Sequence, residues 1–474
     1  MRKIKDFQSP SFIHFIGVGG VGMSALARVL LQMGHKVSGS DLERSSTIEQ
    51  LIKLGLSFHQ GHQTENIKSH FELVVFSSAV QESNPERLAT KALDIREQRR
   101  GVFLADFAQS FDKVIAVAGA HGKTTISTML AYLCKENNIK ATYLIGGKPA
   151  GDMPASEFNG TNILITEVDE SDGTLSFIHA DLALVPNVED DHSWSVGGEE
   201  RLIELFQTFS DQAKKVFYGA FPLAKLIFDD HPNATELALN ESLPVPQLGQ
   251  HNRFNAFLAA QSAQFLGITA PQAKKTLARF PGVERRCSLR LDLPNLRILE
   301  DYAHHPTEMA CFLDALNDEY QDFHKVVIFQ AHRFERVQKY SQDFALELKK
   351  AEQVFITDAF AAWIDHSEKA PIAKLAQQAG KHATYLAGDD WLAIAQKIFQ
   401  ELDLSKKTVI TVMGAGTIQK IIPALRALFI ADRLKKDAPE LLIAQNSACR
   451  DPTPPAPGAL PLVRPVPFGL CVKC

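Results

Sequence analysis

The sequence predicts an α/β protein of three domains with parallel or mostly parallel sheets. The chain has 474 residues, enough for several domains of roughly 100 to 200 residues each. Short apolar runs typical of strands alternate with longer runs of helical periodicity, and this alternation restarts twice along the chain. Two glycine-rich segments lie between a predicted strand and a predicted helix, the position at which α/β sheets bind phosphate groups.

Composition and charge favour a globular protein that acts on small molecules. Hydrophobic residues make up 45% of the chain and charged residues 22%, both near the average for globular proteins. The formal net charge of -5 provides no global attraction to nucleic acid or to an anionic membrane. No apolar run approaches the roughly 18 residues of a membrane span, and no signal peptide is recognisable. We therefore expect small-molecule partners, no nucleic acid or membrane partner, and a cytoplasmic location; the oligomeric state stays open.

The first alternation covers residues 1–110 and contains a βαβ unit. We expect a strand at Phe12–Val18, a helix at Met23–Met33 and a strand at Lys36–Ser40. Apolar runs at Leu73–Phe76 and around Ile95 continue the pattern. Parallel strands need such helical crossovers, so these runs predict one sheet.

The second alternation covers residues 111–286. An apolar strand at Val114–Ala118 enters a glycine-rich loop, and a helix is expected at Ile126–Cys134. Strands at Ile163–Thr166 and Leu182–Pro186 and a helix at Asn252–Leu266 follow. This segment therefore has the pattern of a second domain.

The third alternation covers residues 287–430, and a different segment follows it. Strands are expected around Ile298 and at Lys325–Phe329, Gln353–Thr357 and Thr408–Met413. Residues 452–467 hold seven prolines, too many for a helix or a central strand. We therefore expect residues 431–474 to be a largely disordered tail, in which the CxxC spacing of Cys471 and Cys474 stands alone.

The first glycine-rich turn, residues 17–22, matches GxGxxG and has Asp41 nineteen residues beyond Gly22. Its glycines would let the backbone approach a diphosphate, and Asp41 could accept a hydrogen bond from a ribose hydroxyl. The alternative is a tight βα turn in which glycine only relieves backbone strain. Its position between a strand and a helix favours nucleotide binding.

The second turn predicts a phosphate-binding loop more strongly. It consists of Gly119, Ala120, His121, Gly122, Lys123, Thr124 and Thr125. Lys123 would neutralise β- and γ-phosphates, and the Thr124 hydroxyl would bind Mg²⁺. The full eight-residue pattern would place its first glycine at Val117. A surface turn with a solvated lysine is the alternative, but it does not explain the apolar strand that enters the loop.

Acidic and histidine residues follow two later strands of the second segment. Residues 167–172 read Glu-Val-Asp-Glu-Ser-Asp, and their oxygens suit Mg²⁺ if they lie at the carboxyl edge of the sheet. A solvated acidic loop is the alternative. His192 ends the run 187–192, and its chemistry leaves a general base, a zinc ligand or a hydrogen-bonded loop residue open.

Three further polar clusters lie downstream. Asn252 and Asn255 stand at i and i+3 of a predicted helix, where they could read an adenine edge or where Asn252 could simply cap the helix. Residues 301–308 and 332–336 are dense in histidine, arginine and acidic groups. Arg333 and Arg336 could clamp a carboxylate, although a surface salt bridge is the common role of arginine.

Taken in order, these motifs resemble the Mur ligase family. The resemblance covers about residues 12–430 and rests on GxGGxG, GxHGKTT, ExDESD, NxxxDH, GxHNxxNA, GVxRR, DYAHHPTE and HRxxR in the family's order. It implies a Rossmann-like first domain that binds UDP, a central P-loop ATPase domain, and a Rossmann-like C-terminal domain that receives an amino acid. It also implies ATP and Mg²⁺, or alternatively Mn²⁺, with UDP-N-acetylmuramate and L-alanine as substrates joined through an acyl phosphate.

The resemblance implies a role for each matching residue. Lys123, His192, Arg286 and His304 match catalytic positions, and Thr124, Glu167 and His192 match metal ligands. The ATP side comprises residues 119–125 with Asn252, Asn255, Arg286 and Asp301. The UDP side comprises Gly17, Gly19, Gly20, Gly22, Asp41, Ser77 and Ser78. Positions around the acceptor amine comprise Tyr302, His304, His332, Arg333 and Arg336.

The chain departs from the family pattern at three places. Trp194 stands where an aspartate is usual, Ala331 replaces a proline, and residues 358–363 differ from the usual aromatic-alanine-glycine-glutamate run. The sequence therefore specifies the identity of the acceptor less well than it specifies the ligation reaction. A ligase that attaches a ready-made peptide to the same sugar nucleotide is the nearest alternative. A nicotinamide-dependent dehydrogenase would leave the second glycine-rich loop unexplained, whereas a nucleotide-binding regulator without catalysis stays open.

Overall fold

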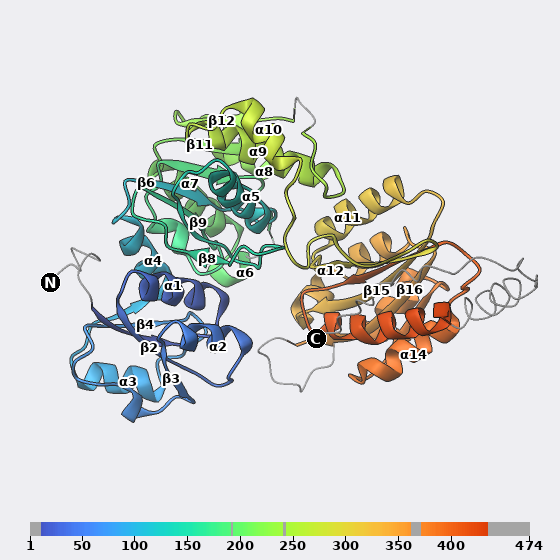
Figure 1. Ribbon diagram of the computed structural model, residues 1–474, viewed down its shortest axis with the longest axis horizontal. Helices are drawn as coiled ribbons and strands as arrows, with labels where there is room; N and C mark the ends of the chain where they lie inside the picture. The colour runs from blue at the N-terminus through green and yellow to red at the C-terminus, as the bar shows by residue number, and fades with distance from the viewer. Residues whose placement is uncertain (1–10, 191–192, 240–242, 362–370, 435–474) are drawn as a thin grey trace, which may run out of the picture. The chain divides into compact units, whose positions relative to one another are not determined.

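The computed structural model describes residues 11–190, 193–239, 243–361 and 371–434 (Figure 1). Three sheets rich in parallel strands organise them, so the predicted α/β class is confirmed. Among the described residues, 390–402 and 420–434 form a second compact unit.

The first sheet is parallel and has the strand order β3-β2-β1-β4-β5. Its strands are β1 (Phe12–Ile16), β2 (Lys36–Asp41), β3 (Ser57–Gln60), β4 (Leu73–Phe76) and β5 (Glu97–Arg99). Its helices are α1 (Val21–Gln32), α2 (Ser46–Lys53), α3 (Pro85–Ala92) and α4 (Arg100–Ala108). Side chains alternate along β1: Phe15 packs in a core with α1 and α4, whereas Ile16 packs in a smaller core with Ala89 of α3. Helices therefore cover both faces.

The central sheet has seven strands in the order β12-β11-β10-β6-β9-β7-β8. They are β6 (Lys113–Val117), β7 (Thr142–Leu144), β8 (Ser156–Glu157), β9 (Ile163–Glu167), β10 (Leu182–Val185), β11 (Val216–Gly219) and β12 (Ala234–Leu237). Its helices are α5 (Lys123–Glu136), α6 (Ser193–Val196), α7 (Glu199–Asp211), α8 (Pro222–Phe228), α9 (Gln250–Gln264) and α10 (Ala270–Leu277). All pairings are parallel except that between β7 and β8.

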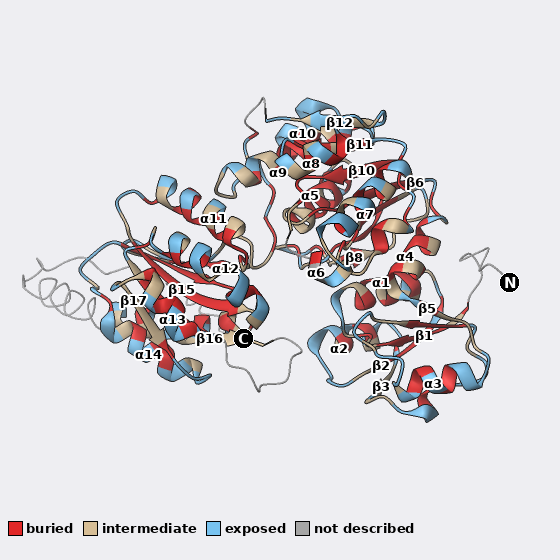
Figure 2. Ribbon diagram, turned by 180° about the vertical axis from the view of Figure 1, so that it is seen from behind, coloured by how far each residue is buried: buried red, intermediate tan, exposed pale blue. Residues whose placement is uncertain are grey.

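The phosphate loop leaves the middle of this central sheet. β6 pairs with β9 on one side and with β10 on the other, so the loops after these three strands meet at one edge. Val114 and Ala116 face the core with α7 and α8, whereas Ile115 and Val117 face the core with α5, α9 and α10. Figure 2 shows these strands buried between exposed helix faces.

The third sheet has the order β13-β14-β18-β15-β16-β17. Its strands are β13 (Ser288–Leu293), β14 (Leu296–Asp301), β15 (His324–His332), β16 (Gln353–Phe360), β17 (Ala383–Leu386) and β18 (Thr408–Met413). One buried core packs it against α11 (Pro306–Glu319), α12 (Phe334–Leu348) and α13 (Ile372–Ala379). β15 is longer than predicted because its pairing with β16 continues past an irregularity between Gln330 and His332. His332 therefore lies in the strand.

The second compact unit contains α14 (Trp391–Glu401) and a helical segment, residues 422–434. Inside this unit the rings of Phe399 and Phe429 lie 5.2 Å apart. Residues 431–434 are helical, although the sequence assigned them to the tail, because the buried residues Ile422, Leu425 and Phe429 continue helical spacing up to this point. The rest of the predicted tail, with Cys471 and Cys474, lies outside the described residues.

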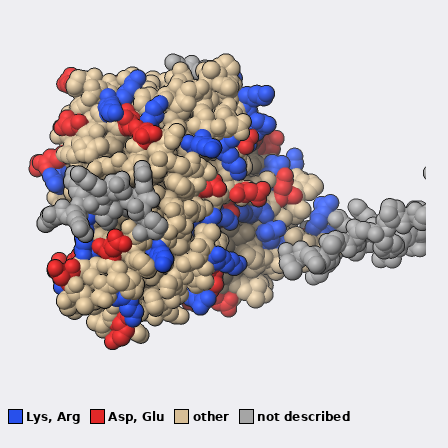
Figure 3. Space-filling model, turned by 60° about the vertical axis from the view of Figure 1, so that its left-hand side comes forward, with Lys and Arg blue, Asp and Glu red and all other residues tan. Residues whose placement is uncertain are grey.

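The described surface carries charges of both signs. Figure 3 shows basic and acidic side chains interspersed on the face that it presents. None of the helices in the described ranges is long and apolar enough to cross a membrane.

Candidate active site

The loop of residues 119–125 has a backbone that only glycine accommodates at two positions. Gly119 has φ +113°, and a Cβ there would lie 2.4 Å from the Asn187 carbonyl oxygen. Gly122 has φ +85°, and its Cβ would lie 2.7 Å from Asn255 Oδ1. The Asn187 amide also accepts from His121 N at 2.8 Å and donates to the His121 carbonyl at 3.1 Å. Asn187, to which no role was assigned from the sequence, therefore helps to hold the loop.

Lys123 begins α5 and points back along the loop. Its Nζ lies 3.0 Å from Glu170 Oε2 and donates to the Gly119 carbonyl. Glu170 is 2% exposed, so this ion pair is sheltered from water. The ammonium group is thus held at the phosphate loop by Glu170, a member of the acidic run 167–172 for which the sequence suggested Mg²⁺ binding and not this ion pair.

Glu167 and Thr124 form an oxygen cluster that fits Mg²⁺. Thr124 Oγ1 donates to Glu167 Oε2 at 3.1 Å, Ser127 Oγ donates to Oε1 at 2.8 Å, and Gly146 N donates to Oε1 at 2.6 Å. Burial raises the pKa of Glu167, which means that its charge gains from a neighbouring cation. A hard cation with oxygen ligands suits this chemistry.

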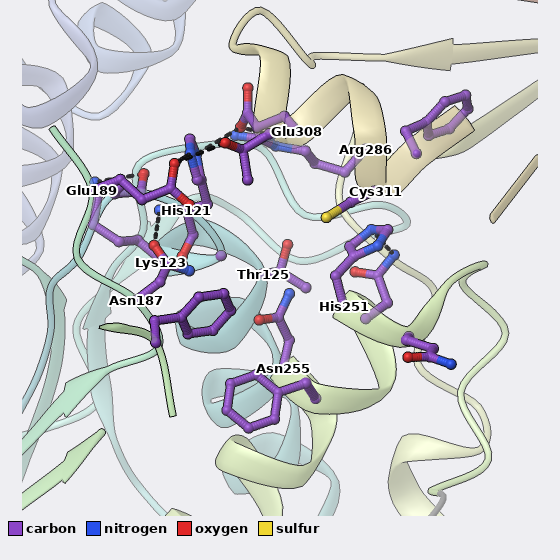
Figure 4. Close-up of a pocket in the computed structure, with 18 of the residues that line it drawn as sticks. His121, Lys123, Thr125, Asn187, Glu189, His251, Asn255, Arg286, Glu308 and Cys311 are labelled. Atoms are coloured by element: carbon purple, nitrogen blue, oxygen red, sulfur yellow. Dashed lines mark hydrogen bonds and ion pairs between the residues drawn. The ribbon is translucent and has the colours of Figure 1, made fainter. Parts of the chain in front are cut away.

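A cavity of about 530 Å³ lies beside the loop (Figure 4). This volume lies within the range of small-molecule sites. Its lining brings together most of the residues predicted for ATP: Ala120, His121, Gly122, Lys123, Thr124, Thr125, Asn252, Asn255, Arg286 and Asp301. Gly119 does not line it, because its role is to turn the backbone.

Asn252 and Asn255 lie on α9 and reach the cavity from one helix. The N-cap of α9 is Gly249 and makes no side-chain cap bond, so Asn252 is not the cap. Its Nδ2 instead donates to the Leu248 carbonyl at 2.8 Å. Burial, with the charge of Arg286 acting in the same direction, lowers the pKa of the neighbouring His251 to about 4. His251 is therefore neutral at pH 7.

A chain of charged groups crosses one side of the cavity. His121 Nε2 lies 3.3 Å from Glu189 Oε2 and its Nδ1 lies 3.4 Å from Glu308 Oε1, while Arg286 Nη1 donates to Glu308 Oε1 at 3.0 Å. Figure 4 shows His121 and Glu308 pointing toward one another, with Arg286 beside them. Burial alone would lower the pKa of His121, but the two carboxylates raise it to about 9. Its imidazole is therefore cationic at pH 7.

Glu189 received no role from the sequence, and Glu308 was considered only as a member of the polar cluster 301–308. Both lie inside motifs that were recognised, but carboxylates are common on protein surfaces, and only the tertiary structure places both against His121. Asp301 is buried as well: it accepts from Cys287 N and from Ala303 N, each at 2.8 Å. Burial raises the pKa of Asp301 to about 6. Its predicted contact with a ribose stays a prediction.

A second cavity, of about 330 Å³, joins the first glycine turn to the phosphate loop. Its lining includes Gly20, Gly22, Ser77, Ser78, Lys123 and Glu167. Asp41 Oδ2 instead accepts from Gly19 N at 2.8 Å, and a Cβ on Gly17 would lie 3.3 Å from the Cβ of Ser77. Gly17, Gly19 and Asp41 therefore shape the turn, and Lys123 is common to both cavities.

The residues predicted around the acceptor gather in the third sheet. The rings of His304 and His332 lie 5.6 Å apart, and His332 stacks on Phe360 at 5.5 Å. Arg285 and Arg286 both lie over the Tyr302 ring, each 4.8 Å from its centroid.

The strand end that carries His332 also places its two neighbouring arginines. Arg336 Nη1 lies 3.5 Å from the His332 carbonyl, and Arg333 has φ +68° as the N-cap of α12. Burial lowers the pKa of His332 to about 3, and the neighbouring cationic groups act in the same direction. Of the five predicted residues, His304 lines the larger cavity, whereas the other four are not among its lining residues.

Besides Cys471 and Cys474, two residues of the sequence predictions lie outside the described residues. They are His192, expected as a metal ligand, and Trp363, one of the departures from the family pattern. Their roles stay predictions.

Comparisons with known proteins identify the family of this chain. The chain matches the family model for the Mur ligase family, catalytic domain, over residues 12–112 and that for the Mur ligase, glutamate ligase domain, over residues 285–416. It is 31% identical to the UDP-N-acetylmuramate–L-alanine ligase of Aquifex aeolicus, over 88% of this chain and 96% of that protein. The chain belongs to the Mur ligase family. The predicted membership of the Mur ligase family is therefore confirmed, and the protein is a ligase of this family.

Solved structures of Mur ligases share the fold. The UDP-N-acetylmuramate-alanine ligase of Thermotoga maritima superposes with a TM-score of 0.74 at 24% identity, covering 89% of this chain and 99% of that one. A murein peptide ligase of Psychrobacter arcticus gives a TM-score of 0.63 at 20% identity, covering 88% and 98%. At these identities the likeness establishes the fold, and the fold alone does not separate one acceptor from another.

Proposed function

We propose that this protein joins the lactyl carboxylate of UDP-N-acetylmuramate to the amino group of L-alanine, with ATP converted to ADP and phosphate. The observation that carries the proposal is that Lys123 lines both cavities. One cavity is lined by most of the residues predicted for ATP, and the other by Gly20, Gly22, Ser77 and Ser78 of the residues predicted for UDP. A carboxylate in the second cavity therefore approaches a γ-phosphate at Lys123.

The first step forms an acyl phosphate. The carboxylate oxygen attacks the γ-phosphorus, the bond between this phosphorus and the β-bridging oxygen breaks, and ADP leaves. Backbone N–H groups of residues 119–125 and the Lys123 ammonium orient the phosphates and offset their charge. Arg286 lines the same cavity and adds a second positive charge. Mg²⁺, which Thr124 and Glu167 would hold, supplies further charge neutralisation when it is bound.

The second step forms the amide. The acceptor nitrogen attacks the acyl carbon, and the bond from this carbon to the phosphate oxygen breaks after a tetrahedral intermediate. His304 lines the larger cavity and is held by Glu308, which accepts from its backbone N–H at 3.0 Å. We assign His304 to the amine end of the reaction, where the proton lost by the nitrogen must be accepted.

The acceptor assignment to L-alanine rests on the relatives. The Aquifex aeolicus protein, 31% identical over nearly its whole length, is named for L-alanine. Arg333 and Arg336 near His332 offer the guanidinium groups that bind an amino-acid carboxylate. We assign residues 1–110 to the sugar nucleotide, 111–286 to ATP and 287–430 to the amino acid, and we place the reaction in the cytoplasm, where ATP is available.

Phosphate release decides between the candidate functions. The purified full chain should release ADP and phosphate only when UDP-N-acetylmuramate and L-alanine are both present with Mg²⁺, and the product should gain the mass of one alanine residue. Turnover with a tripeptide but not with alanine would establish the peptide-attaching alternative. Hydrolysis that needs neither substrate, or no hydrolysis with both, would exclude the ligase proposal, and binding without turnover would identify a regulator.

A further inference from the structure

A second group of potential metal ligands lies beside the phosphate loop, apart from the Thr124 and Glu167 oxygens. It consists of His121, Glu189 and His305, whose ligand atoms all lie within 4.8 Å of one another. We propose that these three residues form a binding site for a transition-metal dication such as Zn²⁺. The site does not depend on the proposed ligase reaction, because it rests on ligand geometry alone.

The separations between ligand atoms are close to those of a zinc site. Zinc–ligand bonds of about 2.0–2.1 Å in a tetrahedron place neighbouring ligand atoms about 3.3 Å apart. His121 Nε2 lies 3.3 Å from Glu189 Oε2, and His305 Nδ1 lies 3.7 Å from the same oxygen. The two histidine nitrogens lie within 4.8 Å of each other, and the ring centroids of His121 and His305 lie 5.3 Å apart with planes 34° from parallel.

The donor atoms select the class of cation. Two imidazole nitrogens and one carboxylate oxygen form the ligand set of many zinc sites with an open fourth position, and Zn²⁺ binding releases the proton of the His121 imidazolium to solvent. Mg²⁺ prefers oxygen ligands throughout and suits the Thr124 and Glu167 cluster. The two sites therefore differ in the cation that each binds best.

Neighbouring groups orient the ligands as in known metal sites. A metal-binding histidine commonly directs its other ring nitrogen to a carboxylate. His121 Nδ1 lies 3.4 Å from Glu308 Oε1, and Arg286 holds this carboxylate at 3.0 Å. Thr307 Oγ1 donates to Glu189 Oε2 at 2.9 Å. Two of the three ligands are thus already fixed in direction.

The site is sheltered, yet a cation can enter it. His305 is 5% exposed, whereas His121 and Glu189 line the cavity of about 530 Å³. His305 Nδ1 accepts from Thr307 N at 3.4 Å and caps α11. This hydrogen bond is long and therefore weak, so a metal bond readily replaces it.

Metal binding to the full chain tests the proposal. Cys471 and Cys474 are both changed to Ser, because thiolates bind Zn²⁺ on their own. In calorimetry without nucleotide and with excess Mg²⁺, one Zn²⁺ should bind per chain, and Co²⁺ should give the visible absorption of a low-coordinate site with nitrogen ligands. Bound Zn²⁺ should also raise the melting temperature, because it binds only the folded chain.

Variants of the ligands locate the ion. His305→Asn keeps a cap acceptor for α11 but removes the imidazole. His305→Asn and Glu189→Gln, each as a single variant, should weaken Zn²⁺ binding at least about tenfold. Thr307→Ala keeps all three ligands and should weaken binding less. His70→Ala, an exposed histidine elsewhere, and Glu167→Gln should leave the affinity unchanged. The proposal would be overturned if the chain bound no Zn²⁺ or if folded His305→Asn bound Zn²⁺ with unchanged affinity. Loss of Zn²⁺ affinity in Glu167→Gln would overturn it as well.

Discussion

Lys123 is the residue at which the two cavities meet, and its ammonium is paired with Glu170. Lys123→Ala should lower the rate of ADP formation at least about a hundredfold, because it removes the positive charge that offsets the γ-phosphate in the transition state. Binding of UDP-N-acetylmuramate should persist, because Gly20 and Gly22 of the first glycine turn line the second cavity and do not line the ATP cavity. Phosphate release and calorimetry with the sugar nucleotide measure the two effects.

The control for this variant separates charge from stability. Lys123→Ala leaves the carboxylate of Glu170 buried without its cation, which is destabilising. The double variant Lys123→Ala with Glu170→Gln removes both charges and should regain stability without regaining activity. Lys135→Ala, at an exposed position of the same helix, should behave as wild type. Activity retained in folded Lys123→Ala would contradict the assignment.

His121 is held between two carboxylates, which raise its pKa to about 9. A histidine whose folded pKa is raised contributes stability that is fully present below its unfolded pKa near 6.5 and is lost as the pH rises through 9. Replacing Glu189 or Glu308 by Gln should lower the pKa of His121, because each substitution removes one negative charge. NMR titration of the ring protons measures this midpoint, and a midpoint near 6.5 in the wild type would contradict the geometry.

At the scale of an element, the phosphate loop depends on the packing of α9 against α5. Gly122→Ala should weaken ATP binding and destabilise the fold, because its φ is +85° and the new methyl group would lie 2.7 Å from Asn255 Oδ1. Gly267→Ala is the matched control: φ is +84°, but nothing lies within 4 Å of its Cβ. Strain alone costs about 1 kcal/mol, so urea unfolding should show a larger loss for Gly122→Ala. Equal losses would mean that Asn255 does not confine the loop.

At the scale of the whole molecule, His121 and Glu308 join the phosphate loop to the start of α11. A double-mutant cycle with His121→Gln and Glu308→Gln should give a coupling free energy of about 1–3 kcal/mol, because both groups are sheltered. Arg201 and Glu204, an exposed pair on α7 with Nη1 and Oε2 2.6 Å apart, should couple by less than about 1 kcal/mol. Urea unfolding at pH 7 measures both cycles. Equal coupling would contradict a structural link.

The sequence predicted the parts of this protein whose physics is local. β4 and β18 begin and end at the predicted residues, β9 and β10 differ from their predictions by one residue at one end, and β6 is shifted by one residue at both ends, because apolar runs of strand length are visible in the chain itself. The phosphate loop was recognised because its two glycines and its lysine follow an apolar strand directly, and this pattern is visible in consecutive residues. β15 was underestimated, since its last residues are decided by pairing with β16.

The sequence by itself determined the α/β class, the two glycine turns and the membership of the Mur ligase family. Strand and helix periodicity and loop motifs depend only on residues that are close together along the chain. Only the tertiary structure placed Lys123 at both cavities, paired Lys123 with Glu170, and set Glu189 and Glu308 on either side of His121. These groups are distant along the chain, and a carboxylate gains its role from the charges beside it, which sheet order and helix packing decide.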